Sequence, residues 1–287
     1  DELLEGWRLS YLKKVVKSDG TLVDFDANKL NKMAEWGSNV GICWSSLVLD
    51  AMKKVTEGCS TEDIQSALID SCAEKSTPEH LAMAARLYVG SLYKKVHGGF
   101  EHRPHLYDFY HDMLVKGVWE EMKYDASDLE YLNSFLDNDK DINYAYSTVK
   151  QISSKYSKKF NGMVCETPQY SFMGIALKVM EEQPEERRLD DVIKLYQYLS
   201  DLKINAPTPF LAGLRTKFKG YASCAVLKAD DEAESLGILV DNAYTMTIAS
   251  AGIGSTMTSR SLGDPVRGGE ITHTGKLPYY RYLEGAV

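Results

Sequence analysis

A short stretch near the end of the sequence, YASCAVLKADD at residues 221 to 231, most constrains the fold. It is typical of a buried β-strand that runs into the acidic start of a helix, and this helix is predicted to reach about residue 250 and end at AGIG. A strand after that helix would complete one parallel α/β unit. Because a parallel sheet needs several strands and cover on both faces, we expect the sheet to be incomplete within these 287 residues.

The first hundred residues predict a compact α+β module. A β-hairpin is expected in VVKSDGTLVDF, residues 15 to 25, because Asp19-Gly20 tolerates the positive φ angles of a tight turn. Capping residues predict three helix starts, at Asp26, at Ser60 with Asp63, and at Thr77 with Pro78. The pair Gly98-Gly99 predicts the end of the third helix.

Residues 104 to 203 are expected to be mostly helical. Thr167-Pro168 predicts a helix start and Pro184 its end, and apolar residues recur at helical spacing again from Leu189 to Leu199. Such stripes indicate core packing. Two prolines in NAPTPF, after Asn205, predict a break before the α/β unit.

Charge and composition exclude several classes of protein. With 41 acidic against 33 basic residues, the net charge of −8 gives no overall attraction to nucleic acid or to an anionic membrane. The sequence lacks an apolar run of 18 residues, so we expect a cytoplasmic protein. Five cysteines without metal-ligand spacing argue against a zinc site and against structural disulfides. Cys72 shares an apolar helix face and is predicted to be core, whereas Cys224 opens the strand described above.

Two groups of basic residues are candidate phosphate sites. Lysines 17, 29, 94 and 95 fall in one small module, although spacing alone favours ordinary solvated lysines. Arg260 and Arg267 lie in a Gly-rich loop in which Gly268-Gly269 let backbone amides approach an anion, and spacing alone does not decide between this and solvation.

Several blocks of the sequence, in order, resemble one family. KSDGTLVDFDANKL, TEDIQSALI and AARLYVGSLYKKVHGGFE are similar to the ATP-cone of the large subunit of class I ribonucleotide reductase. ETPQYSFM, NAPTPFLAGLRT, SCAVLKADD, AGIGSTMTSR and DPVRGGEITHTGKLPYYRYLEGAV resemble successive blocks of its catalytic domain. The resemblance covers about residues 13 to 287.

This resemblance implies a fold and an activity. The fold is an α+β ATP-cone, a mainly helical segment and the first part of a ten-stranded α/β barrel, incomplete in this chain. The expected parts are an N-terminal extension (1–12), the cone (13–103), a helical domain (104–203) and the start of the barrel (204–287). The implied activity is reduction of ribonucleoside diphosphates to deoxyribonucleoside diphosphates by radical chemistry.

Residues with implied roles fall into three sites. Cys224 matches one of two thiols that reduce the ribose and end as a disulfide, with Thr208, Ser223 and Gly252 at the substrate diphosphate and ribose. At the allosteric specificity site, Asp231 matches a carboxylate that receives the effector's deoxyribose, and Arg260 and Arg267 match arginines that bind its phosphates. Contacts of the overall activity site in the cone match Val15, Lys17, Lys29, Thr61 and Lys94.

The sequence departs from the family pattern near these sites. Glu232-Ala233 follows Asp231 where the family commonly has Ser-Leu, and STMTS before Arg260 is one residue short. In the cone, Val23 replaces an acidic residue and Ser18 a basic one. These changes leave the effector specificity of both sites open.

The resemblance also implies ligands and partners. The ligands are ATP or dATP at the cone and deoxynucleoside triphosphate effectors, with Mg²⁺, while the radical cofactor belongs to a separate small subunit and no metal is held by this chain. A thioredoxin or glutaredoxin type reductant and a homo-oligomer are expected, without nucleic acid or membrane partners. Localisation would be cytoplasmic, in the host cytoplasm for a phage protein.

The sequence ends at Val287, ahead of the family's radical cysteine, proton-handling Asn and Glu, second reducing cysteine, tyrosine pair and Cys-rich tail. It is then either a fragment or, as we expect, one product of a split gene, inactive alone and completed by a C-terminal partner polypeptide. The alternative is a non-catalytic module that senses ATP and dATP and controls assembly.

Overall fold

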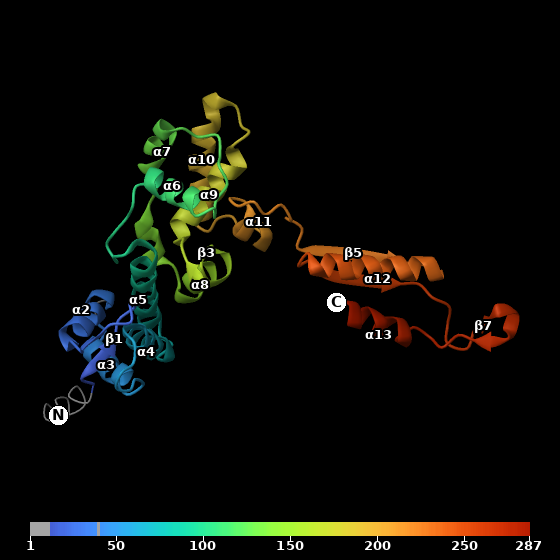
Figure 1. Ribbon diagram of the computed structural model, residues 1–287, viewed down its shortest axis with the longest axis horizontal. Coiled ribbons are helices and arrows are strands. Elements are labelled where there is room, and N and C mark those ends of the chain that lie inside the picture. The colour runs from blue at the N-terminus through green and yellow to red at the C-terminus, as the bar shows by residue number, and fades with distance from the viewer. Residues whose placement is uncertain (1–11, 39–40) are drawn as a thin grey trace. The chain divides into compact units, whose positions relative to one another are not determined.

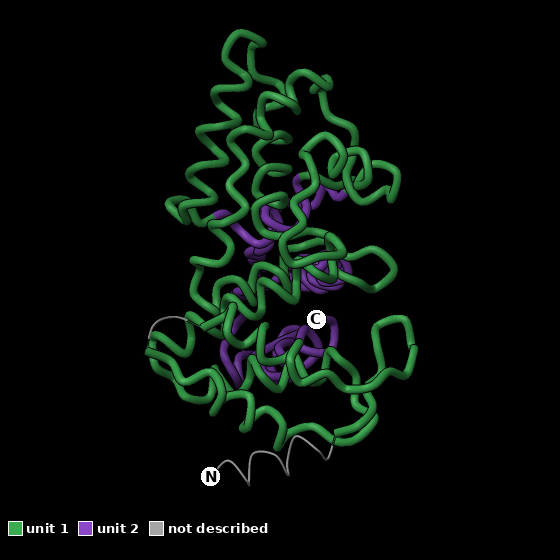
Figure 2. Tube along the Cα trace, turned by 90° about the vertical axis from the view of Figure 1, so that its left-hand side faces the viewer, with its two compact units in different colours: residues 1–205, 215–217 green, residues 206–214, 218–287 purple. Residues whose placement is uncertain are grey.

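The computed structural model of the protein describes residues 12–38 and 41–287 (Figure 1). The expected N-terminal extension at residues 1–12 therefore lies, except for its last residue, outside the described residues. The chain forms two compact units, shown in Figure 2. Unit 1 holds residues 1–205 and 215–217, and unit 2 holds residues 206–214 and 218–287.

Unit 1 is mostly helical. Its first part contains β1 (Lys14–Val16), β2 (Leu22–Asp24), α2 (Ala27–Gly37), α3 (Trp44–Met52), α4 (Thr61–Glu74) and α5 (Pro78–His97). Its second part contains α6 (Leu106–Val115), α7 (Ala126–Asn133), the 3₁₀ helix η1 (Asn138–Asn143), α8 (Tyr146–Gln151), the π-helix η2 (Ile152–Tyr156), β3 (Lys159–Phe160), β4 (Met163–Val164), α9 (Pro168–Met180) and α10 (Glu185–Ser200).

The local signals of the first part form as predicted. Strands β1 and β2 pair antiparallel, and Gly20 in the connecting turn has φ of 82°. The side chains of the predicted capping residues accept hydrogen bonds from backbone N–H groups: Asp26 for α2, Ser60 for α4 and Thr77 for α5. Gly98 ends α5 in the left-handed conformation. Each cap joins groups two or three residues apart, so the sequence determines it locally.

The core of the first part is built by these helices against the hairpin. Buried residues on its elements include Val15, Ala34, Leu47, Leu68 and Leu87. Cys72 is 0% exposed in this core, which confirms its prediction as a packing residue. Farther along α5, Val89 and Tyr93 pack instead with Val149 of α8. Helix α5 thus serves both parts of unit 1.

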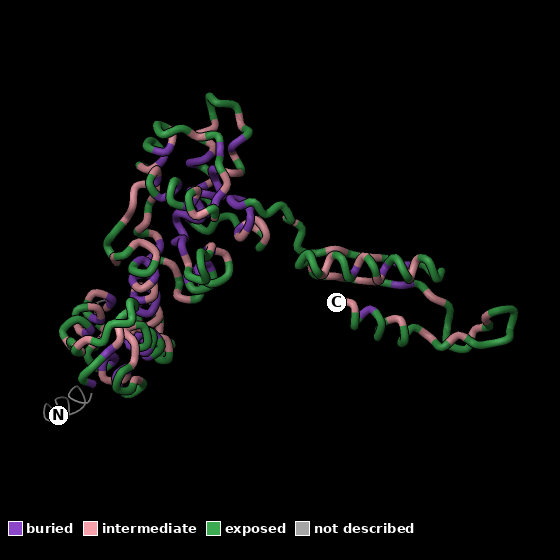
Figure 3. The backbone as a smooth tube through the Cα atoms, in the orientation of Figure 1, coloured by how far each residue is buried: buried purple, intermediate pink, exposed green. Residues whose placement is uncertain are grey.

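The second part of unit 1 is centred on α9. Every residue of α9 from Pro168 to Leu177 is buried, as the colours of Figure 3 also show for this region. The helix ends at Met180, four residues before Pro184, and Pro184 is instead the residue before α10. Proline was the predicted stop, but the turn after Met180 already ends the helix.

Gly174 of α9 packs directly against two large side chains. An added Cβ would lie 2.6 Å from Trp119 and 2.9 Å from Arg215, two fully buried side chains. We expect Gly174→Ala to lower the free energy of unfolding by about 1–3 kcal/mol through overpacking. The control is Gly237→Ala in the helix of unit 2, because nothing lies within 4 Å of its added Cβ and alanine should stabilise that helix by about 0.5–1 kcal/mol. Calorimetric unfolding measures both; equal effects would contradict the packing at Gly174.

Unit 2 contains α11 (Thr208–Gly213), β5 (Cys224–Ala229), α12 (Ala233–Ile248), β6 (Gly252–Met257), β7 (Pro265–Val266), the 3₁₀ turn η3 (Arg267–Gly269), β8 (Ile271–Thr272) and α13 (Leu277–Ala286). Strands β5 and β6 pair in parallel, as the strand, helix, strand pattern predicted. Strand β6 begins inside AGIG, which was predicted as the end of the helix. The described residues form four two-stranded sheets and no closed barrel.

Strand β5 corrects the prediction of a buried strand. Its residues alternate between exposed and covered, and Val226 is 83% exposed. The covered face, with Leu227 and Ala229, packs in a small cluster with residues of α12, β6 and α13. The prediction failed because apolar composition does not say how many faces a strand has covered. Among the described helices, none is long and apolar enough to cross a membrane.

Candidate functional site

Three of the candidate residues meet where β5 and β6 begin. Cys224 is the first residue of β5, and its Cα pairs in register with Gly252, the first residue of β6. The backbone N–H of Gly252 donates to the carbonyl oxygen of Ser223 at 2.8 Å. The Sγ of Cys224 lies 3.7 Å from the Oγ of Ser223. A thiol, a hydroxyl and a glycine backbone therefore share one end of the sheet.

This end of the sheet is open to a ligand. Ser223 and Cys224 are exposed. A Cβ at Gly252 would lie 3.4 Å from the Ser223 carbonyl oxygen and 4.0 Å from the Cys224 Sγ, so glycine keeps the space beside the thiol free. An accessible thiol of this kind can form and break disulfides, chemistry that a buried thiol cannot reach.

Thr208, the fourth candidate for substrate contact, belongs to the same unit. It is the exposed first residue of α11. The ring of Phe210 on α11 packs against Tyr221 with 5.5 Å between centroids, and Tyr221 precedes Ser223 by two residues. Helix α11 therefore packs on the segment that leads into β5.

A second site lies between the start of α12 and α13. Arg260 Nε donates to Asp231 Oδ2 at 2.8 Å, and this hydrogen bond lowers the pKa of the Asp231 carboxyl below its ordinary value. Both side chains line a cavity of about 430 Å³. Its other lining residues are Glu232, Ala233, Leu236, Gly237, Leu239, Val240, Met257, Val266, His273, Tyr279 and Tyr282. The cavity is mostly apolar with two carboxylates and one guanidinium, a composition typical of small-molecule sites.

Aromatic residues of this cavity were not among the candidates. His273 stacks on Tyr279 of α13 with 6.0 Å between centroids, and Tyr282 follows one helical turn later. The spacing of Tyr279 and Tyr282 on a helix was the signal available in the sequence. Arg267, by contrast, is exposed on the turn η3 with φ of 52° and is not among the lining residues.

Arg260→Gln should raise the pKa of Asp231 toward its ordinary value, because the charged hydrogen bond that lowers it is lost. Titration of the Asp231 side-chain carbon by NMR measures this change. Arg281→Gln on α13 changes the same charge at an exposed position outside the lining and should leave the titration of Asp231 unchanged. Equal titrations of Asp231 in wild type and Arg260→Gln would contradict the ion pair.

The candidate residues of the first hundred residues come from elements that contact one another. Val16 of β1 donates its N–H to the carbonyl of Cys59 at 3.0 Å and bridges Ser60, the cap of α4. Thr61 is the next residue and begins α4. Lys95 of α5 pairs with Glu62 at 3.0 Å. The hairpin, the start of α4 and the last turns of α5 thus lie together.

The side chains in this region differ in access. Lys17, Lys29 and Lys94 are exposed, and Thr61 is half-buried. Val15 is 4% exposed and packs in the core, so its side chain cannot contact a ligand in solvent. The described residues include no group of three or more His, Cys, Asp or Glu side chains arranged to hold a metal ion.

Comparison with known proteins shows what the chain as a whole is similar to. A family model described as the ribonucleotide reductase all-alpha domain matches residues 142–219. The chain is 30% identical to the ribonucleoside-diphosphate reductase subunit alpha of Haemophilus influenzae and to subunit alpha of reductase 1 of Escherichia coli, over 95% of this chain and 37% of each relative. It is also 30% identical to the subunit alpha of Enterobacteria phage T4, over 96% of this chain and 38% of the relative. The chain therefore spans little more than a third of the relatives that it matches. Over nearly all of its length the chain is similar to the N-terminal portion of the large subunits of ribonucleotide reductase.

Proposed function

We propose that this chain supplies the N-terminal portion of a ribonucleoside-diphosphate reductase large subunit and contributes Cys224 as one of two reducing thiols. The observation that carries the proposal is the exposed Cys224 thiol beside Ser223 and Gly252 at the open end of β5 and β6. In the reaction, two thiols give two electrons and two protons and join in a disulfide. The ribose C2′–O bond breaks, and the oxygen leaves as water.

The substrate diphosphate and ribose would be held at the same end of the sheet. Ser223 offers a hydroxyl next to the thiol, Gly252 offers close approach of the backbone, and Thr208 offers a hydroxyl at the start of α11. Hydroxyl groups can donate hydrogen bonds to phosphate oxygens, and the N-terminus of a helix favours an anion.

The cavity at Asp231 and Arg260 would be the allosteric specificity site. Asp231 would accept a hydrogen bond from the deoxyribose hydroxyl, and Arg260 and Arg267 would pair with phosphates of a deoxynucleoside triphosphate bound with Mg²⁺. Binding would replace the Asp231–Arg260 ion pair, in whole or in part, by contacts to the effector. Glu232 also lines this cavity, and its negative charge would weaken the binding of a triphosphate by like-charge repulsion.

The first hundred residues would form an ATP-cone that senses ATP against dATP. Lys17, Lys29 and Lys94 would contact phosphates as point charges, and Thr61 would contribute a hydroxyl at the start of α4. Val15 would contribute only through its backbone. The proposal keeps the boundaries 13–103 for the cone, 104–203 for the helical domain and 204–287 for the start of the barrel.

The other catalytic groups of the family would lie in the part of the large subunit that this chain does not match. We propose that a C-terminal partner polypeptide supplies them, in a complex with a small radical-generating subunit and a thioredoxin or glutaredoxin type reductant in the cytoplasm. This chain would be inactive alone and would form homo-oligomers in the complex. A stoichiometric polypeptide that carries the rest of the large-subunit sequence should co-purify with this chain from its source; a single polypeptide that contains both parts would contradict the split.

Leaving this chain out of a reconstituted mixture tests the reductase proposal. The chain is mixed with the C-terminal portion, the small subunit and a dithiol, and formation of dCDP from CDP is measured with and without the chain. We expect dCDP only when all components are present. Turnover that does not depend on this chain would contradict the proposal.

A non-catalytic ATP and dATP sensor is the second candidate. It is favoured by the junction of hairpin, α4 and α5, which brings Lys17, Thr61 and Lys94 into one region. Calorimetry distinguishes the two functions: nucleotide binding without reductase activity in the complete mixture supports the sensor. Absence of ATP and dATP binding would remove the cone from both proposals.

A further inference from the structure

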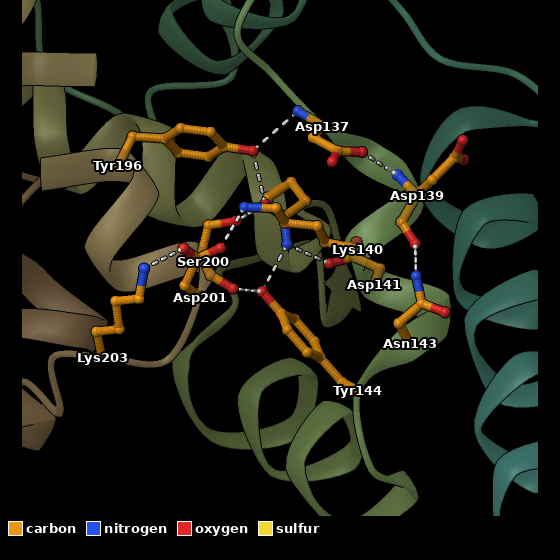
Figure 4. Close-up of polar contacts among 11 residues, drawn as sticks. Asp137, Asp139, Lys140, Asp141, Asn143, Tyr144, Tyr196, Ser200, Asp201 and Lys203 are labelled. Atoms are coloured by element: carbon orange, nitrogen blue, oxygen red, sulfur yellow. Dashed lines mark hydrogen bonds and ion pairs between the residues drawn. The ribbon is translucent and has the colours of Figure 1, made fainter. Parts of the chain in front are cut away.

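A buried carboxylate joins α5 to the helices that follow it. Asp141 of η1 is 0% exposed, and both of its oxygens accept hydrogen bonds. Tyr93 of α5 donates to Oδ2 at 2.7 Å, and Gln169 of α9 donates from Nε2 to Oδ1 at 2.8 Å. Figure 4 shows Asp141 among the polar contacts of this region.

The hydrogen bonds continue from Gln169 into α10. Its Nε2 also donates to the hydroxyl of Tyr144 at 2.8 Å, so both hydrogens of the amide are used. Its Oε1 accepts from Tyr196 at 2.7 Å and from Ser200 at 2.9 Å. Tyr196 in turn accepts from the backbone N–H of Asp137 at 2.9 Å (Figure 4). Gln169 is therefore fixed as a donor toward Asp141.

The charge of Asp141 is not balanced by an ion pair within the described residues. The nearby Lys140 pairs with Asp201, and Asp137 and Asp139 on the same segment are acidic. Arg103 stacks over the ring of Tyr93 at 3.9 Å, and its charge lowers the pKa of Asp141 by less than burial raises it. Tyr93, Tyr144, Tyr170 and Tyr196 are the other titratable groups around it, and burial raises the pKa of each tyrosine. Burial likewise raises the pKa of Asp141 from 3.8 to about 7.

Tyr93 provides an alternative arrangement for a protonated Asp141. Its hydroxyl lies 3.3 Å from the carbonyl oxygen and 3.3 Å from the side-chain oxygen of Asn138. When Asp141 carries a proton, its O–H donates to the Tyr93 oxygen, and the Tyr93 hydrogen turns to Asn138. The same heavy atoms therefore satisfy both protonation states, and only the directions of two hydrogen bonds differ.

We propose that Asp141 is a buried proton-binding site that acts as a pH-sensitive latch between α5 and the segment η1–α9–α10. In the protonated form the latch is neutral and closed. Loss of the proton leaves an unpaired charge in the interior, which favours states in which α5 and η1 separate and water reaches the carboxylate.

The direction of the pH effect follows from the raised pKa. A carboxyl that binds its proton more tightly when folded contributes stability that is complete below its unfolded pKa of 3.8 and is lost as the pH rises to about 7. We therefore expect the backbone amides of η1 and of the last turns of α5 to become less protected as the pH rises from about 4 to about 7, after correction for the intrinsic exchange rate.

Infrared difference spectra of the whole chain test the proton directly. Subtracting the spectrum of Asp141→Asn from that of the wild type should leave a protonated-carboxyl band that persists at pH 6, where exposed carboxyls are ionised, and that disappears near neutral pH. In Tyr93→Phe the ionised form loses a donor, so the band should persist to higher pH. A band that disappears near pH 4 in the wild type would overturn the proposal.

Thermal unfolding gives a second readout. The melting temperature of Asp141→Asn minus that of the wild type should be larger at pH 8 than at pH 5. The reason is that the amide mimics the neutral acid, because its nitrogen donates to Tyr93 and its oxygen accepts from Gln169. The matched control is Asp139→Asn, an exposed carboxylate on the same 3₁₀ helix, for which no such pH-dependent difference is expected. Equal pH dependence of Asp141→Asn and wild type would also overturn the latch.

Discussion

Arg215→Met is expected to lower the free energy of unfolding of unit 1 by about 3–5 kcal/mol, because it leaves a buried carboxylate without its cation. Arg215 and Glu166 are both 0% exposed. Arg215 donates from Nε to Glu166 Oε1 at 2.8 Å and from a terminal nitrogen to the other oxygen. Burial opposes ionisation of Glu166, but the attraction and hydrogen bonds of Arg215 keep its pKa below the ordinary value. Urea denaturation of the wild type and the variant measures the effect.

Two further variants make this prediction specific. Arg187→Met removes an exposed arginine that pairs with Asp191 at 2.7 Å, and this pair is expected to be worth less than about 1 kcal/mol. The double variant Glu166→Gln with Arg215→Met removes both charges and should be more stable than Arg215→Met alone. If Arg215→Met and Arg187→Met cost the same, the buried pair has no special role in the folded state.

Cys224→Ser is expected to reduce dCDP formation in the complete reductase mixture by on the order of 10³-fold or more, because a hydroxyl cannot join in the thiol oxidation that supplies the two electrons and forms the disulfide. The thiol is exposed at the first residue of β5, so the substitution replaces a sulfur by an oxygen at the surface and should leave folding intact. Turnover with a dithiol reductant and the melting temperature are measured together.

Cys43→Ser is the control for the thiol. Cys43 is exposed at the cap of α3 and contacts the hydroxyl of Ser45, which a serine at this position would also reach. We expect full turnover from this variant. Full turnover from Cys224→Ser would remove Cys224 from the reaction.

The sequence predicted best what depends on near neighbours. The caps at Asp26, Ser60 and Thr77 act over two or three residues, and each forms as expected. The parallel pairing of β5 and β6 also followed from a strand, helix, strand order. These features need no knowledge of distant parts of the chain.

What the sequence left undetermined depends on contacts between distant residues. Glu166 and Arg215 are 49 residues apart, and Tyr93 and Asp141 are 48 apart, so neither pair has a local signature. The exposure of Val226 depends on which faces of β5 are covered, and apolar composition does not specify that. The side chain of Val15 is buried because that face of the three-residue strand β1 packs on the core, and the local sequence does not specify which face does so.

The central claim is that Cys224 is oxidised as the ribose is reduced, and disulfide mapping after a single turnover tests it most directly. The complete mixture is given CDP without an external dithiol, quenched with an alkylating agent and analysed by peptide mass spectrometry. We expect the peptide that contains Cys224 to be recovered in a disulfide with a cysteine of the C-terminal portion, in proportion to the dCDP formed. Recovery of alkylated, reduced Cys224 alongside a stoichiometric yield of dCDP would contradict the claim.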